Sequence, residues 1–328
     1  MTSIDSLEKS KITLPAIYPL IDTHTHFDVS VFDKDREILA SKAYEKGVHH
    51  LVLVGYLYRH FERMYETKHS LQSLNMLSQS STDNQDASRV NIHIAIGLHP
   101  FYIEQHTDDH LKAMAIEIAD RRPLAIGEIG LDTFTPAMKE PETFAKQERF
   151  FKAQLDMAVS HHLPVMLHIR KAHAEALAIL KAHDYDAHKL GGIAHSFSGG
   201  VQEAKAFVKL GFKLGVTGQV TNPNAKKLRL AIQAAVDEYG IECLVIETDC
   251  PDMTPVMCQT TSDHLPTPNQ DSSQEYSDTY AHDRNVPSNL PWVLFTLSDL
   301  LDVPPAVLAE QLWHNSCNAL QTTWTYPK

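Results

Sequence analysis

Short apolar segments recur along the chain, and each is followed by a longer stretch with apolar residues at helical spacing. We expect eight strands, at Tyr18–His26, His50–Val54, Ile92–Leu98, Leu124–Ile129, Pro164–Ile169, Gly192–His195, Phe212–Val216 and Glu242–Thr248. Most are nearly continuous apolar runs rich in Val, Ile and Leu, which is typical of strands buried on both faces of a parallel sheet.

Helical spacing is clearest in three of the stretches between these strands: Asp33–Glu45, Glu142–His161 and residues 228–239. The first and third are each followed by a glycine, Gly47 and Gly240, that favours a helix end. Eight strands alternating with helices predict an α/β fold, a single-domain TIM (β/α)8 barrel spanning residues 1–328. An open doubly wound sheet is the alternative, but no G-x-G-x-x-G follows the first strand to favour it.

Two polar segments interrupt the alternation. Ser70–Ser88 is rich in Ser, Gln and Asn and is either an inserted surface loop or a frayed helix end. Met257–Asp283 follows the last strand and is too long for a tight turn. In a barrel it would lie on the rim that carries the active site, either shaping substrate access or as an insertion without a role.

Charge and composition narrow the class of protein. The chain has 41 acidic and 29 basic residues, for a net charge of −12, which is unlike a protein that holds nucleic acid along a broad basic surface. Four cysteines without a C-x-x-C pair do not form a disulfide framework. No stretch of about 18 apolar residues could span a membrane, and the first residues do not resemble a secretory signal. We expect a cytoplasmic protein that does not bind membranes, and nothing indicates a stable protein partner.

The first strand ends in a pair of histidines, among 20 in the chain. His24 and His26 are two apart, so on a strand both side chains point to the same side. About one H-x-H is expected by chance at this histidine content, so the pair alone is weak support for a metal site.

Other strand ends carry similar chemistry. Glu128 lies within the fourth apolar run, His168 and His195 end the fifth and sixth, and Asp249 follows the eighth. Buried charges are costly unless they are paired or bind a metal, and barrel strands end at one face. Imidazoles together with carboxylates suit divalent cations such as Zn or Mn.

We therefore predict two divalent cations (Zn, Mn or Mg), with Glu128 bridging them. The first would be held by His24, His26, Glu128 and Asp249, and the second by Glu128, His168 and His195.

Six motifs, in order along the chain, resemble those of the TatD family and lie closest to its YjjV-like branch. They are His24-Thr-His26-Phe-Asp28, Gly97-Leu-His99-Pro100, Gly127-Glu128-Ile-Gly-Leu-Asp132, His168-Ile-Arg170-Lys-Ala-His173, His195-Ser-Phe-Ser-Gly199 and Glu247-Thr-Asp249-Cys-Pro251-Asp252. The resemblance implies an amidohydrolase-like TIM barrel, a one- or two-metal site and metal-dependent deoxyribonuclease activity.

The predicted reaction is hydrolysis of a phosphodiester by a metal-bound hydroxide, with Glu128 and Asp249 as catalytic residues and Asp249 as general base. The acidic chain favours a small substrate footprint, such as the 3′ end of single-stranded DNA.

Three further residues are candidate substrate contacts. Arg170 offers a fork that matches phosphate oxygens, unless a loop acid pairs with it. His99 would contact a phosphate or be only a rim histidine. His173 resembles a family substrate contact, although a place at a helix start also suits capping or exposure. Asp132 either supports the surroundings of Glu128 or begins a turn.

Two other functions remain open. A small-molecule amidohydrolase or phosphoesterase could use the same metal site, and a neutral amide substrate would not need Arg170. A non-catalytic protein stabilised by its metal is the other possibility, although structural metal sites usually close their coordination sphere.

Overall fold

Eight parallel strands lie side by side in chain order in the computed structural model, which describes residues 16–78, 90–259 and 283–327. They are β1 (Leu20–Thr25), β2 (Val48–Val54), β3 (Asn91–Ile96), β4 (Ala125–Asp132), β5 (Val165–Arg170), β6 (Ile193–Ala194), β7 (Lys213–Val216) and β8 (Leu244–Ile246). Every predicted strand is present, and its ends match the prediction or are shifted by one to three residues.

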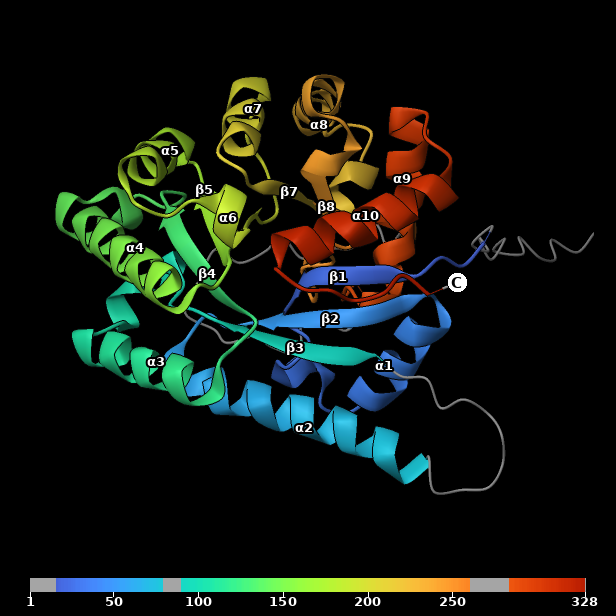
Figure 1. The fold of residues 1–328 in the computed structure, drawn as a ribbon, viewed down its shortest axis with the longest axis horizontal. Coiled ribbons are helices and arrows are strands. Elements are labelled where there is room, and N and C mark those ends of the chain that lie inside the picture. The colour runs from blue at the N-terminus through green and yellow to red at the C-terminus, as the bar shows by residue number, and fades with distance from the viewer. Residues whose placement is uncertain (1–15, 79–89, 260–282, 328) are drawn as a thin grey trace, which may run out of the picture.

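Helices surround these strands, as Figure 1 shows. They are α1 (Arg36–Glu45), α2 (Phe61–Ser78), α3 (Asp108–Arg121), α4 (Pro141–His161), α5 (His173–Ala182), α6 (Ala187–Leu190), α7 (Val201–Lys209), α8 (Lys226–Tyr239), α9 (Leu290–Leu301) and α10 (Pro305–Ala319). The (β/α)8 barrel and the three helices predicted by spacing are confirmed.

The two polar segments are only partly described. Residues 70–78 belong to α2, so a surface loop is the wrong interpretation for them, because the helix simply continues through these polar residues. Residues 79–89 and 260–282 lie outside the described residues. The start of the second segment forms a 3-10 turn, Val256–Cys258.

Backbone hydrogen bonds between the ends of β8 and β1 bring the last strand of the barrel to the first. The Asp249 N–H donates to His24 O at 2.9 Å, and the His26 N–H donates to Cys250 O at 2.9 Å. These two bonds place the H-x-H pair directly beside Asp249.

Successive side chains of a strand belong to two different apolar clusters, one on each face of the sheet. Leu51 and Leu53 of β2 pack in the large cluster that includes residues of the surrounding helices. Val52 and Val54 belong to a second cluster, formed with residues of β3–β6 and β8 and with Ala319 and Leu320 after the last strand. Because successive strand side chains point to opposite faces, the second cluster fills the barrel interior.

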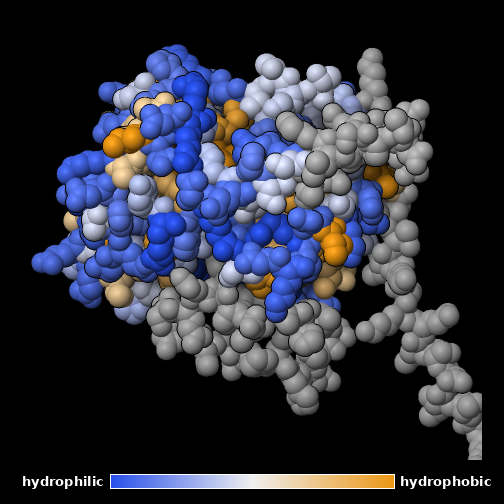
Figure 2. Space-filling view, turned by 90° about the horizontal axis from the view of Figure 1, so that it is seen from below, coloured by the Kyte–Doolittle hydropathy of each residue, from blue (hydrophilic) through white to orange (hydrophobic). Residues whose placement is uncertain are grey.

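The surface seen in Figure 2 is mostly hydrophilic, with small separate hydrophobic patches. Within the described residues, no single helix is both long and apolar enough to cross a membrane. Pro287–Leu301 and Pro305–Ala319 have the required length and apolar composition only together, and they are bent by 114°.

Candidate metal centre

Glu128, on β4, lies at the centre of a buried cluster of histidines. Its Oε2 is 3.3 Å from Nε2 of His24 and 3.6 Å from Nε2 of His26. Its Oε1 is 2.6 Å from Nδ1 of His168 and 3.7 Å from Nε2 of His195. One carboxylate oxygen thus faces the β1 pair, and the other faces the histidines that follow β5 and β6.

Asp249 lies on the side of the cluster formed by β1 and β8. Its Oδ1 is 3.8 Å from Nε2 of His24 and 3.7 Å from Nε2 of His26. Its Oδ2 is 3.5 Å from Nε2 of His195, whose ring stacks on that of His24 at 3.4 Å between centroids. All six ligands expected from the sequence are therefore brought together, and His195 lies as close to Asp249 as to Glu128.

Neighbouring acceptors fix the orientation of three of these imidazoles, those of His26, His168 and His195. Nδ1 of His26 donates to the backbone oxygen of Val54 at 2.9 Å. Nε2 of His168 lies 2.9 Å from Oδ2 of Asp132. Each ring therefore turns its other nitrogen toward the cluster, as in metal sites where an outer partner holds the histidine tautomer.

His195 also has an outer partner for its second ring nitrogen, whereas His24 does not. Nδ1 of His195 is 2.9 Å from Oε1 of Glu247, which leaves Nε2 toward the cluster. Within the described residues neither ring nitrogen of His24 has a hydrogen-bond partner, although the side chain is fully buried and its Nε2 faces the carboxylates of Glu128 and Asp249. Because an unpaired buried polar atom is costly, the residues present fit a cation that would satisfy His24.

Electrostatics follow from this packing. Burial alone would raise the pKa of Glu128, but the surrounding histidines, His99 and His195 foremost, hold it well below its usual range. Burial acts to lower the pKa of His168, yet Glu128 and Asp132 raise it to about 9. Since ligands bind a cation in their deprotonated form, a cation held here would displace a proton from His168.

His99 lies beside the cluster, with Nε2 3.3 Å from Oε1 of Glu128. Its Nδ1 accepts the Phe101 N–H at 3.0 Å. Burial and the neighbouring His168 lower its pKa to about 4, so the ring is neutral and its proton is on Nε2. A protonated Nε2 donates a hydrogen bond in this state, although the ligand atoms of His99, Glu128 and His168 also lie close enough together to hold a cation.

Arg170 ends β5 and is exposed. Its guanidinium lies 3.5 Å from the centroid of the Phe134 ring. The Phe134 N–H donates to Oδ1 of Asp132 at 2.7 Å, which ties this aromatic residue to the group that holds His168. Within the described part of the chain no acid pairs with Arg170, so the salt-bridge alternative is not observed.

His173 is the first residue of α5 and is half-buried. Its ring packs edge-on against Phe197 at 5.9 Å and Phe207 at 6.3 Å. No contact among the described residues joins it to the histidine cluster, so the structure brings His99 to the cluster but leaves His173 beside α7.

Residues 21–321 match the family described as TatD related DNase. The chain belongs to the TatD family. The uncharacterized metal-dependent hydrolase YjjV of Escherichia coli K12 is 35% identical over 236 residues, which is 71% of this chain and 80% of that protein. The 3′-5′ ssDNA/RNA exonuclease TatD of Citrobacter rodentium is 29% identical over 88% of this chain and 93% of its own length.

A crystal structure of the E. coli TatD homologue YjjV superposes with a TM-score of 0.70 at 29% identity, covering 93% of this chain and 98% of that one. The protein is thus a TatD-family metal-dependent hydrolase with an amidohydrolase-like TIM barrel.

Glu247 is a part of this TatD-family site to which the sequence analysis gave no role of its own. Its Oε1 accepts the Ser196 N–H at 2.6 Å, and its Oε2 accepts the Thr23 hydroxyl at 3.1 Å. A Cβ on Gly215 would lie 2.3 Å from this carboxylate, so only glycine leaves room for it on β7. The spacing of Glu247 and Asp249, two residues apart, is the signal that could have indicated a shared direction.

Proposed function

We propose that this hydrolase removes nucleotides from the 3′ end of single-stranded DNA. The observation that carries the proposal is the position of Glu128, whose two carboxylate oxygens each face a different set of histidines. A carboxylate in this position could bridge two neighbouring cations, and paired cations are common in enzymes that cleave phosphodiesters.

The proposed ligands divide as the sequence suggests. One cation would be held by His24, His26, Glu128 and Asp249, and the other by Glu128, His168 and His195, with Zn, Mn and Mg as candidates. Divalent ions bound there would lower the pKa of a water molecule and neutralise charge on the phosphoryl group.

Asp249 would accept the proton of the attacking water. Burial would raise its pKa, but His195 and His24 lower it below its usual value, so the carboxylate is ionised at neutral pH. An ionised carboxylate that is held in place can act as a general base.

The substrate phosphate would be held mainly by the protein's own donors. His99 would donate from Nε2, and Arg170 would supply a charged fork from the end of β5, steadied by Phe134. His173 would assist from the start of α5. The 3′-end preference rests on the activity that the Citrobacter relative's name records and on the net charge of −12, which disfavours a long DNA footprint.

A substrate panel tests this function. Metal-loaded protein should shorten a 5′-labelled single strand stepwise from its 3′ end and leave amides and lactones intact. Arg170→Ala should reduce DNA cleavage at least about tenfold, because a phosphate contact by a charged donor is lost.

The exposed residue Lys152 of α4 provides the control, since Lys152→Ala removes a cation away from the site and should change nothing. Cleavage of amides or lactones with DNA left whole would instead identify a small-molecule amidohydrolase.

A further inference from the structure

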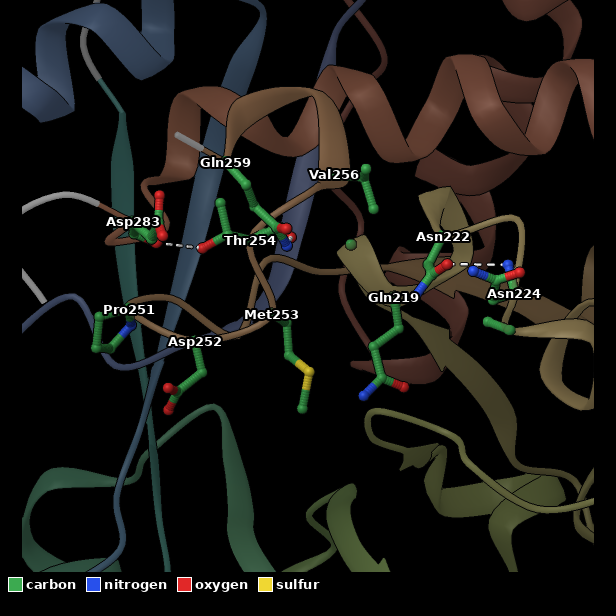
Figure 3. A pocket seen from close by; sticks show the side chains of 12 residues that line it. Gln219, Asn222, Asn224, Pro251, Asp252, Met253, Thr254, Val256, Gln259 and Asp283 are labelled. Carbon is green, nitrogen blue, oxygen red and sulfur yellow. Dashed lines mark hydrogen bonds between the residues drawn. The ribbon is translucent and has the colours of Figure 1, made fainter. Parts of the chain in front are cut away.

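A cavity of about 620 Å³ lies between the chain segments that follow β7 and β8. Gln219 and Asn222 line it from the first segment, and Asp252 and Met253 from the second (Figure 3). The Asp252 N–H donates to the backbone oxygen of Asp249 at 3.0 Å. One short turn therefore carries a proposed metal ligand at its start and a cavity-lining carboxylate at its end.

Two polar side chains in the cavity are free to bind a ligand. No hydrogen bond or ion pair within the described residues involves the carboxylate of Asp252 or the side-chain amide of Gln219. Figure 3 shows both side chains projecting to the same side, with Met253 between them. The cavity thus combines an acceptor, an amide that both donates and accepts, and an apolar thioether.

The wall between the two segments is held in place by the backbone. A Cβ on Gly218 would lie 2.0 Å from the Met253 oxygen, so glycine allows the segments to touch. The Val256 N–H donates to the Thr221 hydroxyl at 2.9 Å, which joins the segments a second time. A cavity so braced exists before a ligand arrives.

The charge of Asp252 limits what can bind. A carboxylate beside the Asp249 carboxylate repels phosphate, so the cavity is unsuited to the charged part of a nucleic acid. It is suited to a hydroxyl donor, and Met253 and the amides suit the face and edge of a nucleobase.

We propose that this cavity binds the 3′-terminal nucleoside of the strand, with the 3′-hydroxyl donating to Asp252. The inference rests on the proposed function and explains how the enzyme would recognise the 3′ end of the strand. The scissile phosphate would lie at the metal centre, the terminal nucleoside toward β7 and β8, and the remaining strand toward Arg170 on β5. Because an amide offers a donor and an acceptor, Gln219 can meet different bases, whereas the Asn222 oxygen already accepts the Asn224 N–H at 2.9 Å.

Nucleoside binding tests the cavity without catalysis. The full chain labelled with ¹³C at methionine methyls is titrated at pH 7.5 with 2′-deoxyadenosine, and Met253→Leu identifies the Met253 signal. That signal should shift, and 2′,3′-dideoxyadenosine should bind about tenfold more weakly, since it lacks the hydroxyl that Asp252 accepts. No shift up to 10 mM (roughly the limit of useful affinity), or equal binding of both nucleosides, would overturn the proposal.

Asp252→Asn should weaken deoxyadenosine binding about tenfold and leave dideoxyadenosine unchanged. Asp237→Asn is the matched control, because Asp237 is an exposed acid of α8, and it should bind as the wild type does. If Asp252→Asn weakened the binding of both nucleosides equally, the cavity would be distorted, and this would contradict the contact between Asp252 and the 3′-hydroxyl.

Cleavage assays separate this inference from the proposed function. Wild-type protein should cleave a strand ending in a 3′-hydroxyl much faster than one ending in a 3′-phosphate. In Asp252→Asn the ratio of these two cleavage rates should be smaller. Cleavage of both strands at the same rate would refute nucleoside binding in the cavity, but it would still support the proposed nuclease activity. Nucleoside binding without any DNA cleavage would refute the nuclease alone.

Discussion

At the scale of single residues, the site depends on partners that aim the histidines. Glu247 contacts Nδ1 of His195 and is itself held by Ser196 and Thr23. Such outer partners fix which nitrogen is free, and losing one typically costs about 10–100-fold in metal affinity. Glu247 therefore acts on the proposed centre through His195 and is a positioning residue.

Glu247→Gln should lower the affinity for Mn²⁺ about 10–100-fold, because the amide cannot hold His195 as a charged acceptor does. Calorimetric titration of metal-free protein measures this directly. Glu242→Gln, at an exposed acid just before β8, is the control. Identical Mn²⁺ affinities in the two variants would exclude a positioning role for Glu247.

At the scale of elements, α4 supports the ends of two strands with buried amides. Gln154 accepts the Leu98 N–H at 2.7 Å and donates to the Leu98 oxygen at 3.3 Å. Seven residues earlier, Gln147 makes the same pair of bonds to the backbone of Asp132, at 2.8 and 2.9 Å. The helix thereby fixes the chain just before His99 and the residue that holds His168.

Gln154→Leu should destabilise the fold by about 2–4 kcal/mol, since it leaves a buried N–H and carbonyl of Leu98 unpaired. Urea unfolding of the metal-free protein measures the change. Lys152→Leu, at an exposed position of the same helix, should stay within about 0.5 kcal/mol of the wild type. A Gln154→Leu variant as stable as the Lys152 variant would show that these bonds contribute little.

The helices and strands are easier to predict from the sequence than the buried glutamine contacts by which α4 holds the strand ends. Apolar periodicity identified the helix that became α4, and Gln147 and Gln154 lie on its buried face, but spacing does not tell which backbone groups their amides bind. All eight strands were predictable because each is an apolar run, and the ligand cluster was predictable because parallel strands end together. The tautomer of His99 and the role of Glu247 depend on contacts between distant segments, which spacing does not encode.

At the scale of the whole molecule, the barrel carries a second histidine group away from the metal centre. Nδ1 of His50 lies 2.9 Å from Nε2 of His93, and the Trp324 ring stacks on His50 at 4.1 Å. The strand pairing places His50 and His93 toward the starts of β2 and β3, and the C-terminal segment packs against them. This packing gives His50 a structural role.

Burial lowers the pKa of His50 to about 4 and that of His93 to about 3. In the unfolded chain both groups would take up protons near pH 6.5, so the free energy of unfolding should fall as the pH drops from about 6.5 toward 4. His93→Gln should make this fall shallower by up to about 1.4 kcal/mol per pH unit, because one proton uptake is removed.

Urea unfolding between pH 7.5 and 5, performed on wild type and His93→Gln without metal, measures the two slopes. The histidines outside this pair titrate in both proteins, so the difference between the slopes reports the contacting pair His50 and His93. Parallel curves would mean that His93 is protonated as readily in the folded chain as in the unfolded one.

The most direct test of the proposed centre counts ions and cleavage in the same sample. Metal-free protein is titrated with Mn²⁺, bound metal per chain is determined by elemental analysis, and each sample is assayed on a 5′-labelled single strand. We predict that two ions bind per chain and that 3′-end shortening rises with their occupancy, while Glu128→Gln loses both together. A wild-type chain that binds its ions and leaves the strand intact, or one that cleaves fully with none bound, would contradict this account.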